Sequence, residues 1–359
     1  MRRLCLTALA IFAACLGLAP AAGAALPKGF VGLSSEDVFA GSAAYRTSNL
    51  SKQASLGVRL QRQAFNWSDI ETAPGRYNLS YYDAYVAAAA AHRIRILPIL
   101  FNPPRFQVSR SSGRATCPPR SNARFGAFAK ALVRRYGSNG TLWRSRPDLP
   151  KTPITAWQIW NEPNLKVYWC NKPNASQYVA MLRVVGKAIK KVDRRAEIVT
   201  AGLPPSKLSG TVPLSRYIAQ MYRAKGRNAF DTMAINSYAV NEAELGRLLR
   251  SVRKLMNSRG DRRARIWITE LGWGDKGLRH RFIVGARGQA RRVTTSFALI
   301  RQQRRRLRLR GVVYFSWRDA RPYPPQYKDM WGLHTGLLKL NGRPKPAYSA
   351  FRRAVRRLR

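Results

Sequence analysis

Two glutamates end apolar segments in a chain that contains few acidic residues. The 359-residue sequence has 17 aspartates and glutamates in total. Glu162 ends the segment 157–162, and Glu270 ends the segment 266–270. Both segments contain tryptophans, and proline or glycine follows each glutamate closely. We therefore expect both carboxyl groups to be partly removed from water, which shifts the pKa of a carboxyl group upward.

A pair of partly buried carboxyl groups is suited to the cleavage of a glycosidic bond. One group must be protonated to release the leaving group, and the other must be ionised to attack the anomeric carbon. Unequal surroundings separate the two pKa values, so each group can hold the protonation state that it needs. A single glutamate at the end of a strand is more often an ion-pair partner, and only the pair favours catalysis. We predict Glu162 as the acid/base and Glu270 as the nucleophile.

The segments that carry these glutamates belong to a regular alternation of short apolar strands and longer helices. Eight strands are predicted at residues 30–33, 57–63, 94–101, 154–160, 197–201, 232–236, 266–269 and 311–316. Eight helices are predicted at residues 42–54, 80–92, 121–136, 174–192, 213–224, 241–258, 286–305 and 344–357. This strict alternation predicts an α/β fold, a single (β/α)8 TIM barrel over residues 25–359.

The barrel interpretation places the two glutamates on one face. Functional residues of a (β/α)8 barrel lie at the C-terminal ends of its strands. Glu162 follows the fourth strand and Glu270 the seventh, and these strands lie across the barrel from each other. A retaining mechanism requires the two carboxyl groups to be about 5–5.5 Å apart. An open doubly wound sheet is the alternative, but it has fewer units and a glycine-rich phosphate-binding turn after its first strand, which this sequence lacks.

Both glutamate motifs resemble those of clan A glycoside hydrolases, the superfamily that includes cellulases, mannanases, xylosidases and iduronidases. The segment 161–163, Asn-Glu-Pro, resembles the acid/base signature of the clan, and the segment 269–272 resembles its nucleophile strand. The resemblance extends through residues 57–98 and through the C-terminal segment 331–348. It implies a (β/α)8 barrel and a retaining glycosidase that cleaves β-linked glycosides or polysaccharides.

The resemblance also implies roles for residues around the glutamates. Arg62 corresponds to a second-strand arginine that hydrogen-bonds the nucleophile, with Arg59 as the alternative if the strand register differs. Asn161 corresponds to the asparagine that contacts the sugar 2-hydroxyl group, and Tyr238 to a tyrosine that hydrogen-bonds the nucleophile. Trp317 corresponds to the aromatic residue beneath the sugar at the cleavage point, where an indole can stack on the pyranose.

One position departs from the pattern of the clan. Many members have a histidine two residues before the sixth-strand tyrosine, where this chain has Asn236. Asparagine can form the hydrogen bond but cannot carry a charge, which alters the expected sugar contacts without affecting the reaction. Trp273 is a further candidate for substrate contact, with packing in the barrel as the alternative. The three histidines are predicted as surface or packing residues: His92, His280 and His334.

Residues 1–24 have the layout of a secretory signal peptide. Two arginines precede an apolar run over residues 4–18, and a small-residue cleavage site follows at 22–24. The run is too short to be a good membrane span, and no later segment is apolar enough to cross a membrane. A lipid anchor on Cys15 is the alternative, but Phe12 is unfavourable at the third position before such a cysteine. We therefore predict a secreted protein.

Two cysteines remain after the predicted signal peptide, Cys117 and Cys170. Cys117 lies in the third strand-to-helix loop and Cys170 in the fourth, on the same face of the barrel. An even pair in an exported protein predicts one disulfide, with Cα atoms about 4.4–6.8 Å apart. Two free thiols are the alternative. The cysteine spacing matches no zinc pattern, and we predict no metal and no cofactor.

The sequence is strongly basic, with a formal net charge of +48 at pH 7. Such a surface favours anionic partners, which include acidic glycans, cell envelopes and nucleic acid. Because the charge is spread along the chain and no nucleic-acid-binding motif accompanies it, we favour solvated helix faces and predict no specific nucleic-acid partner. The predicted partner is a carbohydrate substrate, and an anionic glycan is a hypothesis that the charge supports.

Two other functions fit parts of the sequence. A catalytically inactive carbohydrate-binding barrel would keep the tryptophans and lose a carboxylate, whereas both glutamates are present. A basic envelope-binding protein would explain the charge and would leave the glutamate pair unexplained. Neither the sugar and its linkage nor the oligomeric state is indicated by any motif.

Overall fold

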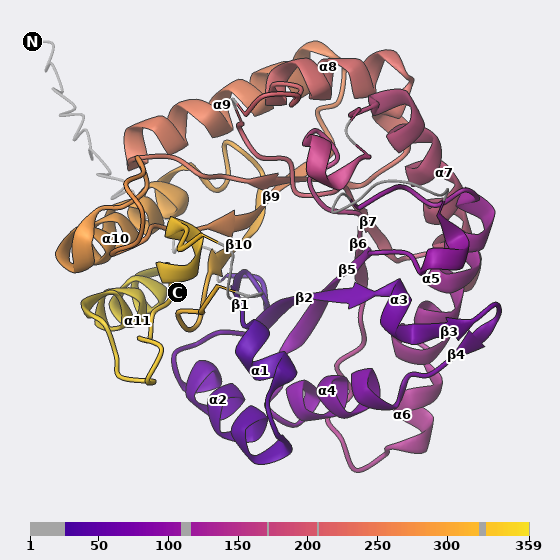
Figure 1. Ribbon diagram of the computed structural model, residues 1–359, viewed down its shortest axis with the longest axis horizontal. Helices are drawn as coiled ribbons and strands as arrows, with labels where there is room; N and C mark the ends of the chain where they lie inside the picture. Colours follow the sequence, from indigo (N-terminus) through magenta and orange to yellow (C-terminus); the bar gives the residue numbers. More distant parts are fainter. Residues whose placement is uncertain (1–25, 109–115, 171, 207, 323–327, 359) are drawn as a thin grey trace, which may run out of the picture.

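The computed structural model describes residues 26–108, 116–170, 172–206, 208–322 and 328–358. The predicted signal peptide therefore lies outside the described residues. Figure 1 shows a central ring of strands surrounded by helices. Among the described residues, we find no helix with the length and apolar character that crossing a membrane requires.

Eight parallel strands close into a barrel, which confirms the predicted (β/α)8 architecture. Their order around the barrel is β1-β10-β9-β8-β7-β6-β5-β2. The strands are β1 Val31–Ser34, β2 Leu60–Asn66, β5 Arg95–Phe101, β6 Ala156–Ile159, β7 Glu197–Val199, β8 Thr232–Asn236, β9 Arg265–Leu271 and β10 Leu309–Phe315. Each strand pairs in parallel with its neighbours, so all eight C-terminal ends open onto one face.

Eight main helices alternate with these strands and cover the outside of the barrel (Figure 1). They are α2 Ala43–Ser55, α4 Ser80–Ala91, α5 Asn122–Tyr136, α7 Ala175–Val192, α8 Leu214–Arg223, α9 Glu242–Ser258, α10 Gly285–Gln303 and α11 Pro346–Leu358. Their bounds agree with the predicted helices within two residues. On most of these helices, the amphipathic spacing of the apolar residues buries one side against the strands, whereas α4 is rich in alanine around its circumference.

Shorter elements in the connections were not predicted. The additional α-helices and strands are α1 Glu36–Ala40, α3 Trp67–Ile70, β3 Glu71–Ala73, β4 Arg76–Tyr77 and α6 Thr141–Ser145. The 3₁₀ helices are η1 Arg105–Gln107, η2 Lys166–Tyr168, η3 Gly226–Asn228 and η4 Trp331–His334. With the exception of α6 and η3, they all lie in strand-to-helix connections and therefore build the face onto which the strands open.

The second strand begins three residues later than predicted, at Leu60 instead of Gly57. Gly57 has a φ of 91° and its backbone N–H donates to the carbonyl of Ala54, 3.0 Å away. A positive φ is accessible to glycine without a steric cost, so this residue completes the turn that ends α2. The strand then continues as far as Asn66.

Side-chain caps define where several helices begin. Ser42, Ser121, Asn174 and Asn241 each accept a hydrogen bond from the backbone N–H three residues later. Such a bond satisfies one of the backbone donors that a helix start leaves unpaired, and its loss costs roughly 1 kcal/mol. Ser80 and Asn122, by contrast, are the first residues inside their helices.

A single layer of side chains fills the interior of the barrel below the open face. The layer comprises Leu60, Leu97, Ala156, Val199, Ala234, Trp267 and Val313. Trp267 is by far the largest of these side chains, and the glycines of neighbouring strands leave room for the layer. A Cβ on Gly32 would come within 2.9 Å of Leu60, and one on Gly311 within 2.9 Å of the Trp267 indole nitrogen. The core is therefore packed and leaves the open end of the barrel for polar side chains.

Candidate active site

A second layer of inward-facing side chains lies next to this core layer, toward the C-terminal ends of the strands. Side chains alternate between the two faces of a strand, so a residue two positions after a core member also faces the interior. The residues at such positions include Arg62, Gln158, Asn236 and Phe315. The first three are buried and polar, and Phe315 is half-buried at the end of β10. The strands thus deliver an arginine and two amides to the centre of the open face.

Glu270 reaches the same centre because β9 is irregular at its C-terminal end. Ile235 of β8 pairs with Ile268, but the next residue, Asn236, pairs with Glu270, so one residue is inserted in β9. An extra residue of this kind redirects the side chains that follow it. Both Thr269 and Glu270 consequently contact residues at the open end of the barrel. In a regular strand, one of these two side chains would point away from the barrel interior.

Glu270 is held by a cation and a phenol. Its Oε1 atom accepts a hydrogen bond from Arg62 Nη1 at 2.8 Å, and its Oε2 atom accepts one from the Tyr238 hydroxyl group. Arg62 is 4% exposed and Glu270 8% exposed, so the ion pair is buried. Arg62 also donates to Gln158 Oε1 at 2.8 Å and to Asn161 Oδ1 at 3.1 Å. These bonds fix the guanidinium and, through it, the orientation of the Glu270 carboxylate.

Glu162 lies in a different environment. Asn236 Nδ2 donates to its Oε1 atom at 2.6 Å, and no cation is hydrogen-bonded to it among the described residues. Removal from water and the negative charge of Glu270 raise the pKa of Glu162 to about 8. The neighbouring backbone is unusual, because Trp160 and Glu162 both have a positive φ, of 74° and 44°. Such conformations are uncommon for residues other than glycine and concentrate at functional sites.

A hydrogen bond from Thr269 sets the orientation of the Asn236 side chain. Its Oδ1 atom accepts from the Thr269 hydroxyl group at 2.9 Å, so its NH₂ group must point toward Glu162. Gly202 makes this arrangement sterically feasible, because a Cβ there would lie 2.2 Å from Asn236 Oδ1. The residue that departs from the histidine of the clan is therefore a directed hydrogen-bond donor to Glu162.

Hydrogen bonds and electrostatic interactions thus connect five of the residues predicted from sequence: Glu162, Glu270, Arg62, Asn161 and Tyr238. Asn236 joins them through its bond to Glu162. The alternative arginine, Arg59, lies three residues earlier and donates to the carbonyls of Ala54 and Val58 at the start of β2. Strand β2 therefore has the register in which Arg62 faces the site.

Two predicted aromatic contacts need correction. Trp317 has no exposed surface, and its indole N–H donates to Asn49 of α2 at 2.9 Å. Trp273 has no exposed surface either, and its indole N–H donates to the carbonyl of Ala239 at 2.7 Å. Neither ring can present a face to a sugar in this arrangement, so both tryptophans pack within the protein. Phe315 is the inward-facing aromatic residue at the end of β10.

Three residues that the sequence did not single out take part in the site. Gln158 anchors Arg62, and its position between buried apolar residues of β6 was the available signal. Burial, Glu162 and Glu270 together raise the pKa of Tyr168, which places this phenol near both carboxyl groups. Phe315 could have been found by continuing the inward alternation of β10 from Val313. Tyr168 lies in a loop, and no local pattern identifies it.

An aromatic cluster adjoins Tyr238 at the rim of the site. The Trp331 ring lies 5.0 Å from that of Tyr238 and 4.8 Å from that of Phe282, measured between ring centres. His280 stacks on Trp331 at 5.6 Å and 9° between planes. His334 is buried and pairs with Asp329 at 2.6 Å, whereas His92 follows the end of α4. None of the three histidines contacts either candidate catalytic glutamate in the contacts described.

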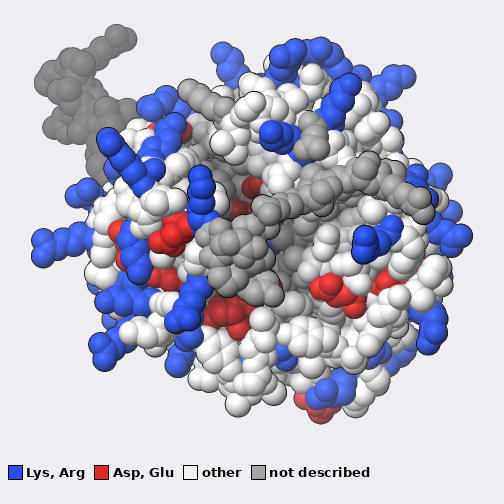
Figure 2. Space-filling view, in the orientation of Figure 1, with Lys and Arg blue, Asp and Glu red and all other residues white. Residues whose placement is uncertain are grey.

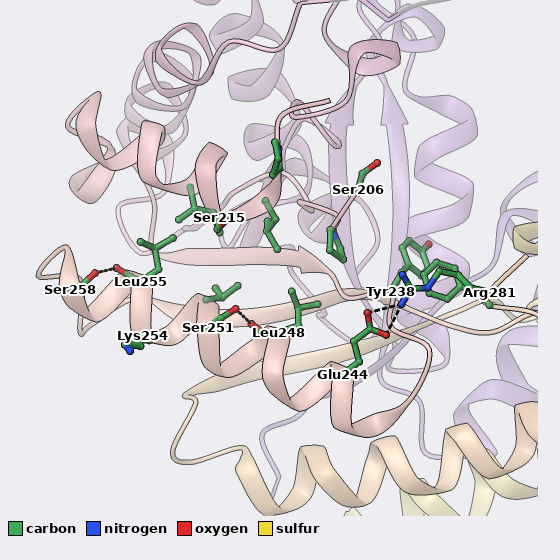
Figure 3. A pocket seen from close by; sticks show the side chains of 16 residues that line it. Ser206, Ser215, Tyr238, Glu244, Leu248, Ser251, Lys254, Leu255, Ser258 and Arg281 are labelled. Carbon is green, nitrogen blue, oxygen red and sulfur yellow. Dashed lines mark hydrogen bonds and ion pairs between the residues drawn. The ribbon is translucent and has the colours of Figure 1, made fainter. Parts of the chain in front are cut away.

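A cavity of about 580 Å³ extends from Tyr238 between α8 and α9. Figure 3 shows Tyr238 and Arg281 at one end of it and Lys254 and Ser258 at the other. Its walls are largely apolar, and Glu244 is paired with Arg281 at 2.8 Å. Tyr238 is the one site residue that lines it, so the chemistry of the two glutamates is not centred in this cavity.

The described residues also include a group that has the composition of a metal site. Asp275, Asp319 and His334 place ligand atoms within 4.8 Å of one another. The ammonium group of Lys345 lies among them and donates to Asp275 at 2.8 Å, to Asp319 at 2.7 Å and to the carbonyl of His334 at 3.0 Å. Lys345 therefore supplies the positive charge that balances these carboxylates.

The predicted disulfide is present between Cys117 and Cys170. Their Cα atoms are 4.7 Å apart, within the expected range. The bond joins the connection after β5 to the connection after β6, which contains Asn161 and Glu162. It therefore braces the loop that carries Glu162 against the neighbouring loop.

Removing this disulfide should lower stability by about 4 kcal/mol in the chain-entropy description of a loop of this length. The sequence separation of the two cysteines is 53 residues, which is long enough for a large entropic effect. Denaturant unfolding of the Cys117→Ser/Cys170→Ser protein beside the oxidised wild type measures the change. Reduced wild type is the matched control, and it should unfold with the double variant; equal stability of oxidised and reduced protein would contradict the expectation.

Several solved structures share this fold. A family 39 glycoside hydrolase from Bacteroides cellulosilyticus WH2 aligns with a TM-score of 0.65 at 19% identity, covering 91% of this chain and 63% of the other. The GH39 enzyme from Xanthomonas axonopodis pv. citri aligns with a TM-score of 0.68 at 17% identity, covering 90% and 65%. A GH5_18 enzyme from Streptomyces cattleya aligns with a TM-score of 0.66 at 14% identity, covering 92% and 80%.

This chain thus spans less than two thirds of the length of the two family 39 enzymes. No protein-family model and no curated protein matches the sequence. At these identities the likeness establishes the fold alone: the chain shares the (β/α)8 barrel architecture of these enzymes.

Proposed function

We propose that this protein is a retaining glycoside hydrolase in which Glu162 is the acid/base and Glu270 the nucleophile. The observation that carries the proposal is the unequal environment of two carboxyl groups at the open end of one barrel. Glu270 is ion-paired with the buried Arg62, whereas the pKa of Glu162 is raised to about 8 by burial and by the charge of Glu270. At neutral pH one group is ready to attack and the other holds a proton, which is the division of roles that glycosidic cleavage requires.

The proposed reaction has two displacement steps. In the first, Glu270 forms a bond to the anomeric carbon while the glycosidic C–O bond breaks, and Glu162 gives its proton to the departing oxygen. The negative charge of Glu270 then disappears in the ester, so the pKa of Glu162 falls and it becomes able to accept a proton. In the second step Glu162 takes a proton from water, the water oxygen bonds to the anomeric carbon, and Glu270 leaves as a carboxylate.

Residues around the pair support these roles. Arg62 and Tyr238 both donate to Glu270, which positions its carboxylate and stabilises the charge that reappears when the ester is hydrolysed. Asn236 donates to Glu162 and so favours its ionised form, which the second step needs. Asn161 accepts from Arg62 through its carbonyl oxygen, which leaves its NH₂ group available to a sugar hydroxyl group.

The sugar is the open part of the proposal, because proteins of this fold act on several. The similar structures include a β-xylosidase from Caulobacter crescentus, an exo-β-1,4-mannosidase from an Opitutaceae bacterium, a glucosidase from Croceicoccus marinus and a β-galactosidase from Marinomonas ef1. Their TM-scores lie close together, between 0.61 and 0.64. Loop side chains, and not the barrel, therefore select the sugar.

A panel of aryl β-glycosides covering these four sugars tests the proposal. We expect hydrolysis of at least one, and proton NMR of the first-formed product should show the β-anomer, as two successive inversions require. An initial α-anomer would contradict the retaining mechanism. No hydrolysis of these substrates or of β-linked polysaccharides would contradict the glycosidase function itself, in favour of a carbohydrate-binding barrel.

We further propose that the protein is exported. The signal-peptide layout of residues 1–24 supports export, and so does the disulfide between Cys117 and Cys170, because such bonds persist in oxidising compartments. A fusion of residues 1–30 to a reporter, with and without the arginines at positions 2 and 3 and the apolar run, tests the targeting directly. Retention of the reporter inside the cell would contradict the proposal.

The rate should fall at alkaline pH because Glu162 must be protonated for the first step. With a pKa of about 8 for Glu162, kcat/KM should be high near neutral pH and should fall about ten-fold per pH unit well above 8. Initial rates on the best aryl glycoside between pH 5 and pH 10 measure the profile. A rate that declines steadily from weakly acidic pH would show that the proton donor has an ordinary carboxyl pKa.

Replacing Asn236 by alanine should move this alkaline limb to higher pH. Asn236 donates to the Glu162 carboxyl group and lowers its pKa, so its removal raises the pKa of Glu162 further. The comparison is the pH profile of Asn236→Ala beside that of Asn161→Ala, which loses a contact to Arg62 instead. The alkaline fall in rate of Asn161→Ala should occur at the same pH as in wild type. If the alkaline fall of Asn236→Ala also occurs at the wild-type pH, the assigned contact is contradicted.

A further inference from the structure

The face of the barrel opposite the candidate active site carries a large excess of positive charge. This face is built by the segment before β1 and by the seven connections that lead from a helix to the next strand. These segments are 26–30, 56–59, 92–94, 137–155, 193–196, 224–231, 259–264 and 304–308. Each of them contains lysine or arginine, and together they hold seventeen such residues against four aspartates. The fold therefore brings cations from eight separate segments together on one face that contains few acidic residues.

The four aspartates of this face already have partners. Asp148 pairs with Arg146 at 2.7 Å, and Asp231 pairs with Lys190 at 2.9 Å. Asp193 accepts from Ser138 at 2.6 Å, and Asp261 accepts from Tyr222 at 2.7 Å. Four carboxylates against seventeen cations leave this face with a strong positive potential.

The acidic residues collect on the other face. Figure 2 views the side onto which the strand-to-helix connections open, and it shows carboxylates gathered near its centre and lysines and arginines around its edge. Together with Glu270 near the end of β9, the strand-to-helix segments and the first turns of the following helices contain twelve of the 17 acidic residues, including both candidate catalytic glutamates. The two ends of the barrel therefore differ in their balance of charge, and a polyanion is attracted more strongly to the basic face.

A pocket on the basic face gathers its cations around one point. It has a volume of about 290 Å³ and is lined by Lys28, Arg59, Arg93, Arg95, Pro150, Lys151, Thr152 and Pro153. None of these lining residues, which all lie in the described part of the chain, is acidic. Arg59 is held in place by hydrogen bonds to the carbonyls of Ala54 at 2.7 Å and Val58 at 2.8 Å. Five cationic side chains from four separate segments thus converge on a space with room for roughly ten waters.

We propose that this pocket binds phosphate groups of a linear, phosphate-bearing polyanion that continues over the basic face. Arginine guanidinium groups match the geometry of phosphate oxygens, and lysines add point charges, so a pocket with three arginines and two lysines suits this ligand. The neighbouring helix-to-strand connections extend the cations beyond one pocket, which favours a polymer over a single ion. Such a polymer would hold the protein with its catalytic face turned away from the anchoring surface.

Binding of long-chain inorganic polyphosphate, measured by calorimetry between about 50 and 200 mM salt, tests the proposal. We expect binding that weakens steeply with salt, because the polymer releases counterions when the cations neutralise it. The variant Lys28→Gln/Arg93→Gln/Lys151→Gln removes three exposed pocket cations. It should weaken binding by about ten-fold or more at low salt and reduce the slope of log K against log salt by about 2.

The matched control removes the same charge from the catalytic face. The variant Lys172→Gln/Lys276→Gln/Arg279→Gln changes three exposed cations in strand-to-helix connections. It should bind polyphosphate within about three-fold of wild type and with the same salt slope. Equal weakening of binding in the two triple variants would show that overall charge, and not the pocket, binds the polymer. No binding by wild type would overturn the proposal entirely.

A second readout separates this surface from the candidate active site. The pocket variant should hydrolyse the best aryl glycoside at the wild-type rate, and saturating polyphosphate should not inhibit wild type. Competitive inhibition by polyphosphate would place the polymer in the catalytic cleft and would contradict the proposal. Tighter binding of dextran sulfate than of polyphosphate, with the same response to the pocket variant, would overturn the assignment to phosphate. Because binding is measured directly, these outcomes do not depend on whether the glycosidase function holds.

Discussion

Glu270→Gln should lower kcat on an aryl glycoside by about 10⁴-fold or more, because the variant loses the atom that forms the covalent intermediate. Glutamine keeps the shape of the side chain and can still accept from Arg62, so the site should remain assembled. Purified variant and wild type are compared at neutral pH with the best substrate of the panel. The loss should appear in kcat and not in KM, because the substitution leaves the other side chains of the site unchanged.

Glu244→Gln is the matched control for this loss. Glu244 lies in the neighbouring cavity and pairs with Arg281, and its Oε2 atom accepts from the backbone of Val240. The same chemical change at this position should leave kcat within about three-fold of wild type, because the group touches no reacting atom. Thermal unfolding of both variants shows whether either substitution alters the fold. A Glu270→Gln protein with more than a tenth of the wild-type kcat and a normal melting curve would remove Glu270 as the nucleophile.

Glu162→Gln should show a loss that depends on the leaving group. With a basic leaving group, kcat/KM should fall by about 10²–10⁴-fold, the usual contribution of a positioned general acid. A dinitrophenyl leaving group needs no proton, so the first step should remain fast. The second step still lacks its base, so we expect a rapid burst of one dinitrophenol per enzyme followed by slow turnover. Stopped-flow absorbance distinguishes this outcome from an equal loss on both substrates without a burst, which would contradict an acid/base role.

The same variant has an expected effect on stability. The pKa of Glu162 is about 8 in the folded protein against an ordinary value of 4.5. Between these two pH values the folded protein holds a proton that the unfolded chain has lost, so wild-type stability should fall as pH rises through this window. Glutamine cannot ionise, and Glu162→Gln should therefore become more stable relative to wild type from about pH 4.5 to about pH 8. Denaturant midpoints at pH 5 and pH 8 measure the change, and a constant difference would contradict the raised pKa.

The barrel and the positions of its two glutamates could be predicted because they depend on local patterns. Apolar runs of strand length alternate with helical segments eight times, and few other folds accommodate that number of units. Arg62 and Tyr238 could be predicted because the motifs around them fix their distance from the ends of their strands. The contact of each with Glu270 then follows from the closure of the barrel.

The aromatic residue of the eighth strand shows where a motif misleads. Trp317 resembles the tryptophan of the clan in type and approximate place, but the inward alternation of β10 runs through Val313 and Phe315 and ends there. Trp317 lies beyond the strand and packs toward α2 through its bond to Asn49. The period-two pattern of the strand was a better guide than the residue type.

Other parts of the site depend on contacts between distant segments. The extra residue in β9 is defined only by pairing with β8, so no pattern within 265–271 indicates that Glu270 turns inward. Gly202 matters because of its approach to Asn236, which is 34 residues away in the sequence. The basic face is a similar case, since each helix-to-strand connection contributes only a few cations and the fold alone brings them together.

Trapping of the covalent intermediate shows whether Glu270 is the nucleophile. The wild-type protein is incubated with an activated 2-deoxy-2-fluoro-β-glycoside of the sugar that it hydrolyses, digested, and examined by peptide mass spectrometry. We expect one added fluorosugar on the peptide that contains Glu270, and no such label in Glu270→Gln. A label on another residue, or an enzyme that hydrolyses the normal substrate and is never labelled, would contradict this assignment.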